Sequence, residues 1–128
     1  MPGYGRTNTI IGNATSGSGA ALTAKLPNQA STGGVIFAAT AGGTALAGVS
    51  AVQRWRIHSV FGGYSAAPAA GALLTITDGV FIILLPALLG FSGIGLDIQC
   101  AAGAEVDFTL AAGGGSILSY ITVICSVE

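Results

Sequence analysis

The chain has 128 residues and a mass of 12.5 kDa, the size of one ordinary domain. Charged residues make up 7% of it, against about 25% in an average soluble domain, while 52% of its residues are hydrophobic. Its net charge is −1 and it has no cluster of Lys and Arg, which excludes a nucleic-acid binder that neutralises phosphates. A folded monomer of this mass exposes roughly 6,000 Å². Because so few charges cannot solvate that surface, we predict that other subunits cover much of it.

The N-terminal segment is rich in Gly, Ser, Thr, Asn and Ala and shows no sustained apolar periodicity. Residues 1–33 are therefore predicted to form an extended or flexible arm that becomes ordered along another subunit. Residues 34–128 are predicted to form a single β-sandwich domain. The aliphatic residues available to anchor the arm are Ile10, Ile11, Leu22 and Leu26.

Short strands are predicted through the middle of the chain. Val35 to Phe37 begins a weak strand candidate, and Leu46 to Val49 gives another or a loop. Residues 52–61 alternate as a half-exposed strand does, with Trp55, Ile57 and Ser59 on one face and Arg54, Arg56, His58 and Val60 on the other. Gly62 and Gly63 are expected to bend or bulge this strand.

The second half of the chain shows clearer strand signals. Residues 72–77 form a strand candidate, and Asp78-Gly79 is the strongest hairpin cue in the sequence. One strand is expected after Gly79, a second after Pro86, and another over residues 93–100. Residues 105–110 alternate, so three side chains are predicted to face inward, and a long terminal strand covers residues 117–127. The inward residues are Val106, Phe108 and Leu110.

The uncharged segment 79–96 has the length of a membrane-spanning helix. Pro86 lies in its middle, three glycines interrupt its second half, and its flanks are acidic instead of carrying Lys or Arg. Isoleucines and aromatic residues in short runs favour strands instead. We interpret the run as a strand with one face on its own core and the other on a partner chain, and keep a small integral membrane protein as an alternative.

The predicted fold is all-β, an antiparallel β-sandwich or jelly roll with an extended N-terminal arm. The prediction depends on about seven short strands, glycine-rich connections and the absence of a helical apolar stripe.

Three segments resemble small β-sandwich structural proteins of tailed bacteriophages and prophages. They are Tyr64-Ser65-Ala66-Ala67-Pro68 through Gly71, Leu73 to Asp78-Gly79, and Val106 to Gly114. The resemblance covers residues 52–127. It implies a capsid decoration or cement protein located in the virion, commonly trimeric and bound to a major capsid protein. A small tail protein or other minor virion component is the alternative it leaves open.

Few residues suggest chemistry. The single histidine, His58, is interpreted as a surface or interface residue, and no enzymatic activity is predicted. Cys100, Cys125 and His58 lack zinc spacing, while Glu105 and Asp107 could hold a hard cation but fit a solvated strand face better. Neither a metal nor a cofactor is expected. No secretory signal is visible, so synthesis in the host cytoplasm is expected, and one disulfide is permitted but not required.

The predicted mechanism is binding between copies and onto a shell, without small-molecule substrate, nucleic acid or membrane. All basic residues lie before residue 65 and all acidic residues after residue 77, so we also predict that one subunit's basic face meets a neighbour's acidic face. A secreted ligand-binding sandwich would need exposed aromatic residues grouped on one face. The predicted interface residues are Ile10, Ile11, Leu22, Leu26, Arg54, Trp55, Arg56, Phe81, Ile82, Ile83, Leu84, Leu85 and Phe91.

Overall fold

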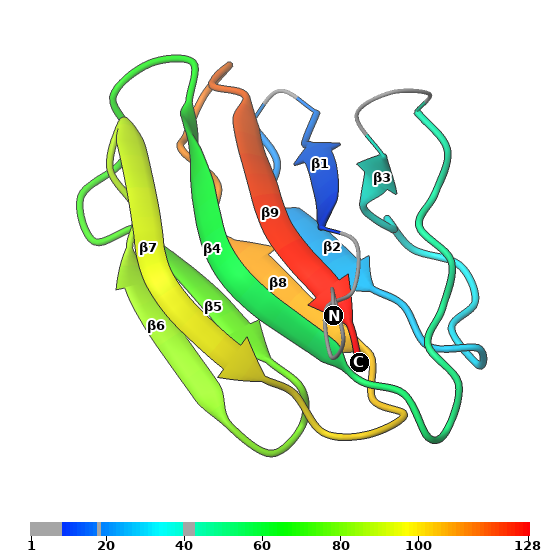
Figure 1. Ribbon diagram of the computed structural model, residues 1–128. Helices are drawn as coiled ribbons and strands as arrows, with labels where there is room; N and C mark the ends of the chain where they lie inside the picture. The colour runs from blue at the N-terminus through cyan, green and yellow to red at the C-terminus, as the bar shows by residue number, and fades with distance from the viewer. Residues whose placement is uncertain (1–8, 18, 40–42) are drawn as a thin grey trace.

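The computed structural model describes residues 9–17, 19–39 and 43–128, and within them the fold is two antiparallel sheets packed face to face without a helix (Figure 1). This confirms the predicted β-sandwich. The five-stranded sheet contains, in spatial order, β3 (Ala38–Ala39), β1 (Ile10–Thr15), β9 (Ser119–Val127), β4 (Trp55–Tyr64) and β7 (Gly90–Gln99). The four-stranded sheet contains β2 (Leu22–Leu26), β8 (Val106–Leu110), β5 (Leu73–Thr77) and β6 (Ile82–Pro86).

The first half of the chain pairs with the second half in a nested order. β1 pairs with β9, β2 with β8, β4 with β7, and β5 with β6, each in antiparallel register. Additional pairing of β4 with β9 and of β5 with β8 joins these four strand pairs into two sheets. Successive strands therefore change sheet, except at the β5–β6 turn and between β3 and β4, which is the jelly-roll order. That order places β6 and β7 at the same side of the molecule (Figure 1).

One hydrophobic core fills the space between the sheets. The three inward predictions in β8 are confirmed, because Val106, Phe108 and Leu110 are completely buried. Phe108 meets the ring of Phe37 edge to face, with ring centroids 4.9 Å apart. Trp55 is also completely buried, and its indole Nε1 donates to the carbonyl oxygen of Pro27 at 2.8 Å.

The predicted alternation in β4 fails at His58. The register of β4 shifts between Ile57 and Ser59 against both neighbouring strands. Against β9, His58 is the extra residue of a β-bulge, whereas against β7 the extra residues lie on β7, between Ile94 and Ile98. After the bulge the inward positions change parity, and Val60 is completely buried instead of facing away from Trp55. Gly62 and Gly63, expected to bend the strand, lie within it, and a Cβ on Gly62 would lie only 2.5 Å from the Phe91 ring.

The predicted N-terminal arm is wrong for most of its length. β1 and β2 fall within residues 1–33, yet each belongs to a sheet, while residues 1–8 lie outside the described residues. The apolar signal is weak here because small residues face the core. A Cβ added to Gly12 would lie 2.9 Å from the Cβ of Phe37, so this position admits no larger side chain. Leu22 and Leu26 are core residues of the same sandwich.

The uncharged segment 79–96 forms strands, so the membrane-helix alternative is wrong. In the part of the chain that the structure describes, no helix has the length and apolarity needed to cross a bilayer. β6 ends at Pro86, and one strand, β7, replaces the two expected after it.

Asp78 fixes the β5–β6 turn at the tip of the nested pairing. Its Oδ1 accepts hydrogen bonds from the N–H groups of Val80 (2.8 Å) and Phe81 (3.1 Å), and its Oδ2 accepts from Ala101 (2.7 Å). Burial alone would raise the pKa of Asp78, but the hydrogen bonds from Ala101, Phe81 and Val80 hold it below the ordinary value. The predicted Asp-Gly hairpin is thus confirmed, with a tie to the β7–β8 loop that the sequence did not indicate.

Replacing Asp78 with Asn is expected to lower the free energy of unfolding at pH 7 by about 1–3 kcal/mol, because hydrogen bonds to a charged acceptor are lost. A carboxyl whose pKa is depressed on folding stabilises the fold above its unfolded pKa, about 3.9, and this stabilisation is lost as the pH falls through the folded pKa. Urea unfolding should therefore show a difference between wild type and Asp78→Asn at pH 7 that shrinks at pH 3.

The matched control is Asp107→Asn. Burial, and then the neighbouring Glu105, raise the pKa of Asp107, so removing its charge at pH 7 should cost little or stabilise the fold. Equal losses in both variants at pH 7 would contradict the role assigned to Asp78.

Candidate functional site

β6 is the most exposed strand of the sandwich. Ile82 and Leu84, on its outer face, are 71% and 58% exposed, and Pro86 is exposed as well. Aliphatic residues at both ends of the strand and on β5 extend the exposed apolar surface. They are Leu73, Val80, Leu88 and Leu89. The surface defined by these residues and β6 is called the β6 edge below.

The inner face of β6 is not fully covered either. Its burial pattern alternates between exposed and intermediate, so that Ile83 and Leu85 are only half-buried. Phe81, Phe91 and Leu96 are likewise partly buried against the core from this side of the molecule. The core is therefore open to solvent between β6 and β7, whereas inward residues of β8 are completely buried.

The backbone of β6 presents unpaired groups at this edge. The Ala87 N–H donates to the Ala72 oxygen at 2.9 Å, continuing the β5–β6 register. Because antiparallel residues point their backbone groups alternately toward and away from the partner strand, those of Ile82, Leu84 and Pro86 point away from β5. The edge thus offers two N–H donors and three carbonyl acceptors, with no donor at Pro86.

The other sheet edges are covered or irregular. The backbone of Lys25 on β2 bonds to Val35 and Phe37, which run alongside it, and β3 pairs with β1. β7 is long, but Gly95 and Asp97 adopt positive φ angles of 77° and 46° and interrupt its pairing. Proteins protect sheet edges by such coverage, bulges and charges, and β6 has only its short length and terminal proline.

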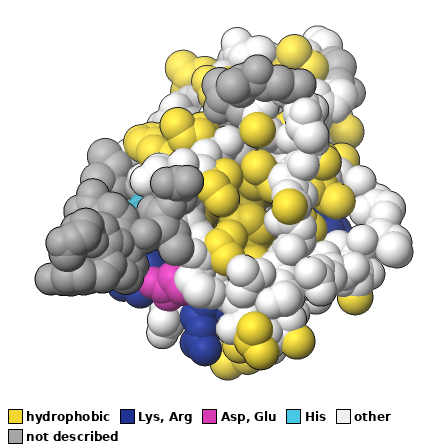
Figure 2. Space-filling model, turned by 45° about the vertical axis from the view of Figure 1, so that its right-hand side comes forward, with side chains coloured by type: hydrophobic (Ala, Val, Ile, Leu, Met, Phe, Trp, Pro, Cys, Tyr) yellow, Lys and Arg dark blue, Asp and Glu magenta, His cyan; other side chains and the backbone are white. Residues whose placement is uncertain are grey.

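Apolar side chains also show on other parts of the surface. Figure 2 brings forward the side of β3 and shows hydrophobic side chains over its middle, with the charged groups of this view mainly toward its edges. Apolar surface alone therefore does not single out the β6 edge. The unpaired backbone groups of β6, together with its apolar side chains, do so.

The predicted interface residues separate into two groups. Trp55, Leu22 and Leu26 are buried in the chain's own core, so their assignment as contacts is corrected. Ile11 is 44% exposed, but it lies on β1 of the five-stranded sheet, whereas β6 belongs to the other sheet. Ile10 packs against the core. The residues that the structure brings together at the open side are Phe81, Ile82, Ile83, Leu84, Leu85 and Phe91.

Two of the basic residues, Lys25 and Arg56, pair with carboxylates of their own chain. The predicted basic-to-acidic contact between subunits stays a prediction. Arg56 binds Asp97 through Nε (2.8 Å) and Nη2 (3.1 Å), and its Nη1 lies 3.2 Å from Glu128. Lys25 Nζ lies 3.3 Å from Glu105. Arg54 is half-buried, and its backbone exchanges hydrogen bonds with Glu128.

A polar cluster crosses β4, β7 and β9. His58 Nε2 lies 2.9 Å from Ser126 Oγ, and His58 Nδ1 lies 3.7 Å from Asp97 Oδ1. The bulge positions His58, and Asp97 is the one non-glycine residue with positive φ in the described residues. Hydrogen bonds from Arg56 hold the pKa of Asp97 below its ordinary value.

This cluster has the atom order of a serine–histidine–aspartate relay but not its access. A serine nucleophile must reach a substrate carbonyl, and Ser126 is 4% exposed. Both oxygens of Asp97 are engaged by Arg56 instead of orienting the imidazole. We therefore interpret the cluster as a structural link between three strands.

The acidic residues considered for a cation have other partners. Glu105 accepts a hydrogen bond from Ser31 Oγ at 2.6 Å and pairs with Lys25. Asp107 lines an open groove of about 320 Å³ together with Lys25 and two threonines. Among the described residues there is no group of three or more His, Cys, Asp or Glu side chains placed to hold a metal ion.

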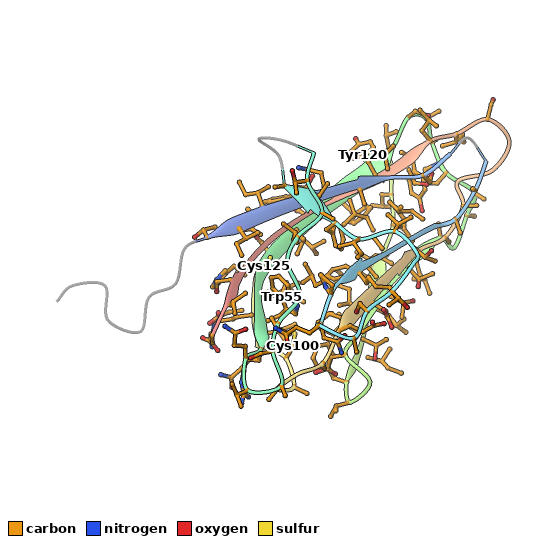
Figure 3. The ribbon with its side chains drawn as sticks, turned by 90° about the vertical axis from the view of Figure 1, so that its right-hand side faces the viewer. Trp55, Cys100, Tyr120 and Cys125 are labelled. Atoms are coloured by element: carbon orange, nitrogen blue, oxygen red, sulfur yellow. The ribbon has the colours of Figure 1, made fainter. Side chains whose placement is uncertain are left out.

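Cys100 and Cys125 are free thiols in the core, near Trp55 (Figure 3). The Cys100 N–H donates to Trp55 on one side of β4, and Cys125 pairs with Ile57 on the other side. Strands lie about 4.8 Å apart, so two strand spacings alone separate the Cα atoms by roughly 9–10 Å, and the two-residue offset along β4 adds to this, which is beyond the reach of a disulfide. Burial raises the pKa of each thiol to about 12, with Asp78 adding to the effect at Cys100, and Cys100 at Cys125.

Both thiols are expected to stay reduced and to react slowly in the folded protein, since the thiolate is the reactive form. With a chromogenic disulfide reagent at pH 8, two thiols per chain should react rapidly in 6 M guanidinium and far more slowly without it. Rapid reaction of the folded protein, or the absence of titratable thiols after unfolding, would contradict this arrangement.

Comparisons with known proteins assign the chain neither a family nor a function. No family model and no curated protein matches the chain. A search of solved structures returned the "Crystal Structure of FLHE", with a TM-score of 0.44 and 11% identity over 93% of this chain and 96% of that one. At this TM-score the likeness carries no argument about function.

The predicted virion role is corrected, because the comparisons return no phage protein. The structure returned is not a phage capsid protein, and nothing in the comparisons connects the chain to a capsid, a tail or a major capsid protein. The role of decoration protein is therefore not carried forward. The jelly roll does not restore it, because one fold serves many functions.

Proposed function

We propose that this protein acts by binding, without catalysis, as a structural subunit that assembles with other copies of itself through the β6 edge. The observation that carries the proposal is an edge strand with free backbone donors and acceptors, whose outer side chains Ile82 and Leu84 are apolar and exposed. Such an edge is a template for pairing with another chain.

The charge distribution supports contact between copies. No charged residue occurs from Gly79 to Leu96, so two copies meet at this surface without like-charge repulsion. Burying a fully exposed Leu or Ile side chain contributes about 1.5–3 kcal/mol, and several aliphatic side chains of the β6 edge are at least half exposed. Association still has to offset the loss of translational and rotational freedom.

Leu84→Lys is expected to weaken assembly by about ten-fold or more, because it removes apolar contact and places a charge in the interface. Val52→Lys is the matched control, since Val52 is an aliphatic residue of the loop before β4, is 85% exposed and is not part of the β6 edge. Sedimentation velocity over a concentration series should show associated wild type and Val52→Lys and dissociated Leu84→Lys. A monomeric wild type, or equal association of both variants, would contradict the proposal.

A further inference from the structure

We infer that the β6 strands of two copies pair with each other, antiparallel about a two-fold axis, and give a closed dimer with a continuous eight-stranded sheet. This inference rests on the proposed function and specifies which surface of the second copy the β6 edge meets. Three observations support it: the coverage of the other edges, the arrangement of the free backbone groups, and the position of Pro86.

The first observation restricts the partner surface. A three-fold ring or an open chain needs a heterologous contact, in which β6 meets a different surface of its neighbour. The edge of β2 is hydrogen-bonded at Lys25 to Val35 and Phe37, β1 is covered by β3, and β7 is interrupted at Gly95 and Asp97. The regular edge left for pairing in the described part of the chain is β6 itself, which makes the contact isologous and closed.

The free groups of β6 are self-complementary in antiparallel pairing. When Ile82 of one copy lies opposite Leu84 of the other, the N–H of each donates to the carbonyl of its opposite residue. The two-fold axis repeats this pair, so four hydrogen bonds use every outward N–H donor of both strands. Ile82 and Leu84 then form one apolar row across the joined outer face.

Pro86 selects this register over the alternative with Leu84 opposite Leu84. The alternative places Pro86 opposite Ile82, where its ring would occupy the position of a donated hydrogen. In the register inferred, Pro86 lies beyond the first residue of the partner's β6, because that strand begins at Ile82. The axis then passes between the two Ile83 residues, which form a non-hydrogen-bonded pair with Cα atoms about 4.5 Å apart.

The half-buried inner residues gain cover in this arrangement. The side chain of Ile83 lies on the inner face of β6, where the core is open. At the axis it would meet the same side chain of the partner. The pairing therefore covers apolar surface on both faces of the strand.

Disulfide trapping tests the inference. Ile83→Cys should form a covalent dimer under mild oxidation, since a non-hydrogen-bonded antiparallel pair brings the Cα atoms within disulfide range. Leu84→Cys, which lies opposite Ile82, should cross-link at least about five-fold more slowly, because diagonal neighbours are about 7–8 Å apart. Wild type is the control, since its own two cysteines are buried.

Faster trapping of Leu84→Cys would overturn the register. Failure of both variants to cross-link, while Leu84→Lys still dissociates the wild-type assembly, would overturn β6-to-β6 pairing and leave the proposed function standing. A wild type that is monomeric would overturn both. If Ile83→Cys does not fold, light scattering on wild type decides: a mass of two chains that stays constant with concentration supports the closed dimer, and three chains or continued growth overturns it.

Discussion

The nested antiparallel pairing of the two halves of the chain is the constraint on which the rest of the structure depends. Because β5 and β6 are the innermost pair, joined by the Asp78-Gly79 turn, β6 has no later strand to pair with and lies at a sheet edge. The outer pairs, β1 with β9 and β2 with β8, lie toward the opposite side, where residues 35–39 cover their edges. The fold therefore protects one side and leaves the other open.

The residues of the β6 edge include none of the chain's few charged groups. The accessible surface is 6361 Å², close to that expected for a compact monomer of this mass, so the chain is folded tightly and not loosely collapsed. Arg56, Lys25 and their carboxylate partners are engaged within the chain. What distinguishes the β6 edge is the lack of the charges and bulges that protect other edges, for example Asp97 on β7.

Sequence reasoning succeeded where a strand keeps its period and has large inward residues. Val106, Phe108 and Leu110 show that pattern, and the Asp78-Gly79 turn has its own local chemistry. It failed for β1 and β2, because Gly12, Ala14 and Ala24 face the core and give no apolar signal. Val60 was assigned to the wrong face because nothing in the local sequence marks the bulge at His58.

The candidate site was only partly predictable, because local sequence does not show which strands become neighbours. The run from Phe81 to Leu85 indicated contact with another surface, but an apolar run does not tell a free edge from a central strand. Trp55 was wrongly assigned to an interface. Its hydrogen bond to Pro27 joins residues far apart in sequence, and a local sequence pattern does not predict such a contact. The contacts of His58 with Ser126 and Asp97 join three strands in the same way.

The central claim is that the outward N–H groups of Ile82 and Leu84 are hydrogen-bonded to another copy of the chain. Amide hydrogen exchange on the concentrated wild-type protein tests it most directly. Protection of both N–H groups in wild type, and fast exchange at Ile82 in dissociated Leu84→Lys while its β4 and β9 amides stay protected, is the result expected. Exchange of both groups at the rate of a free edge, at every concentration, would contradict the account.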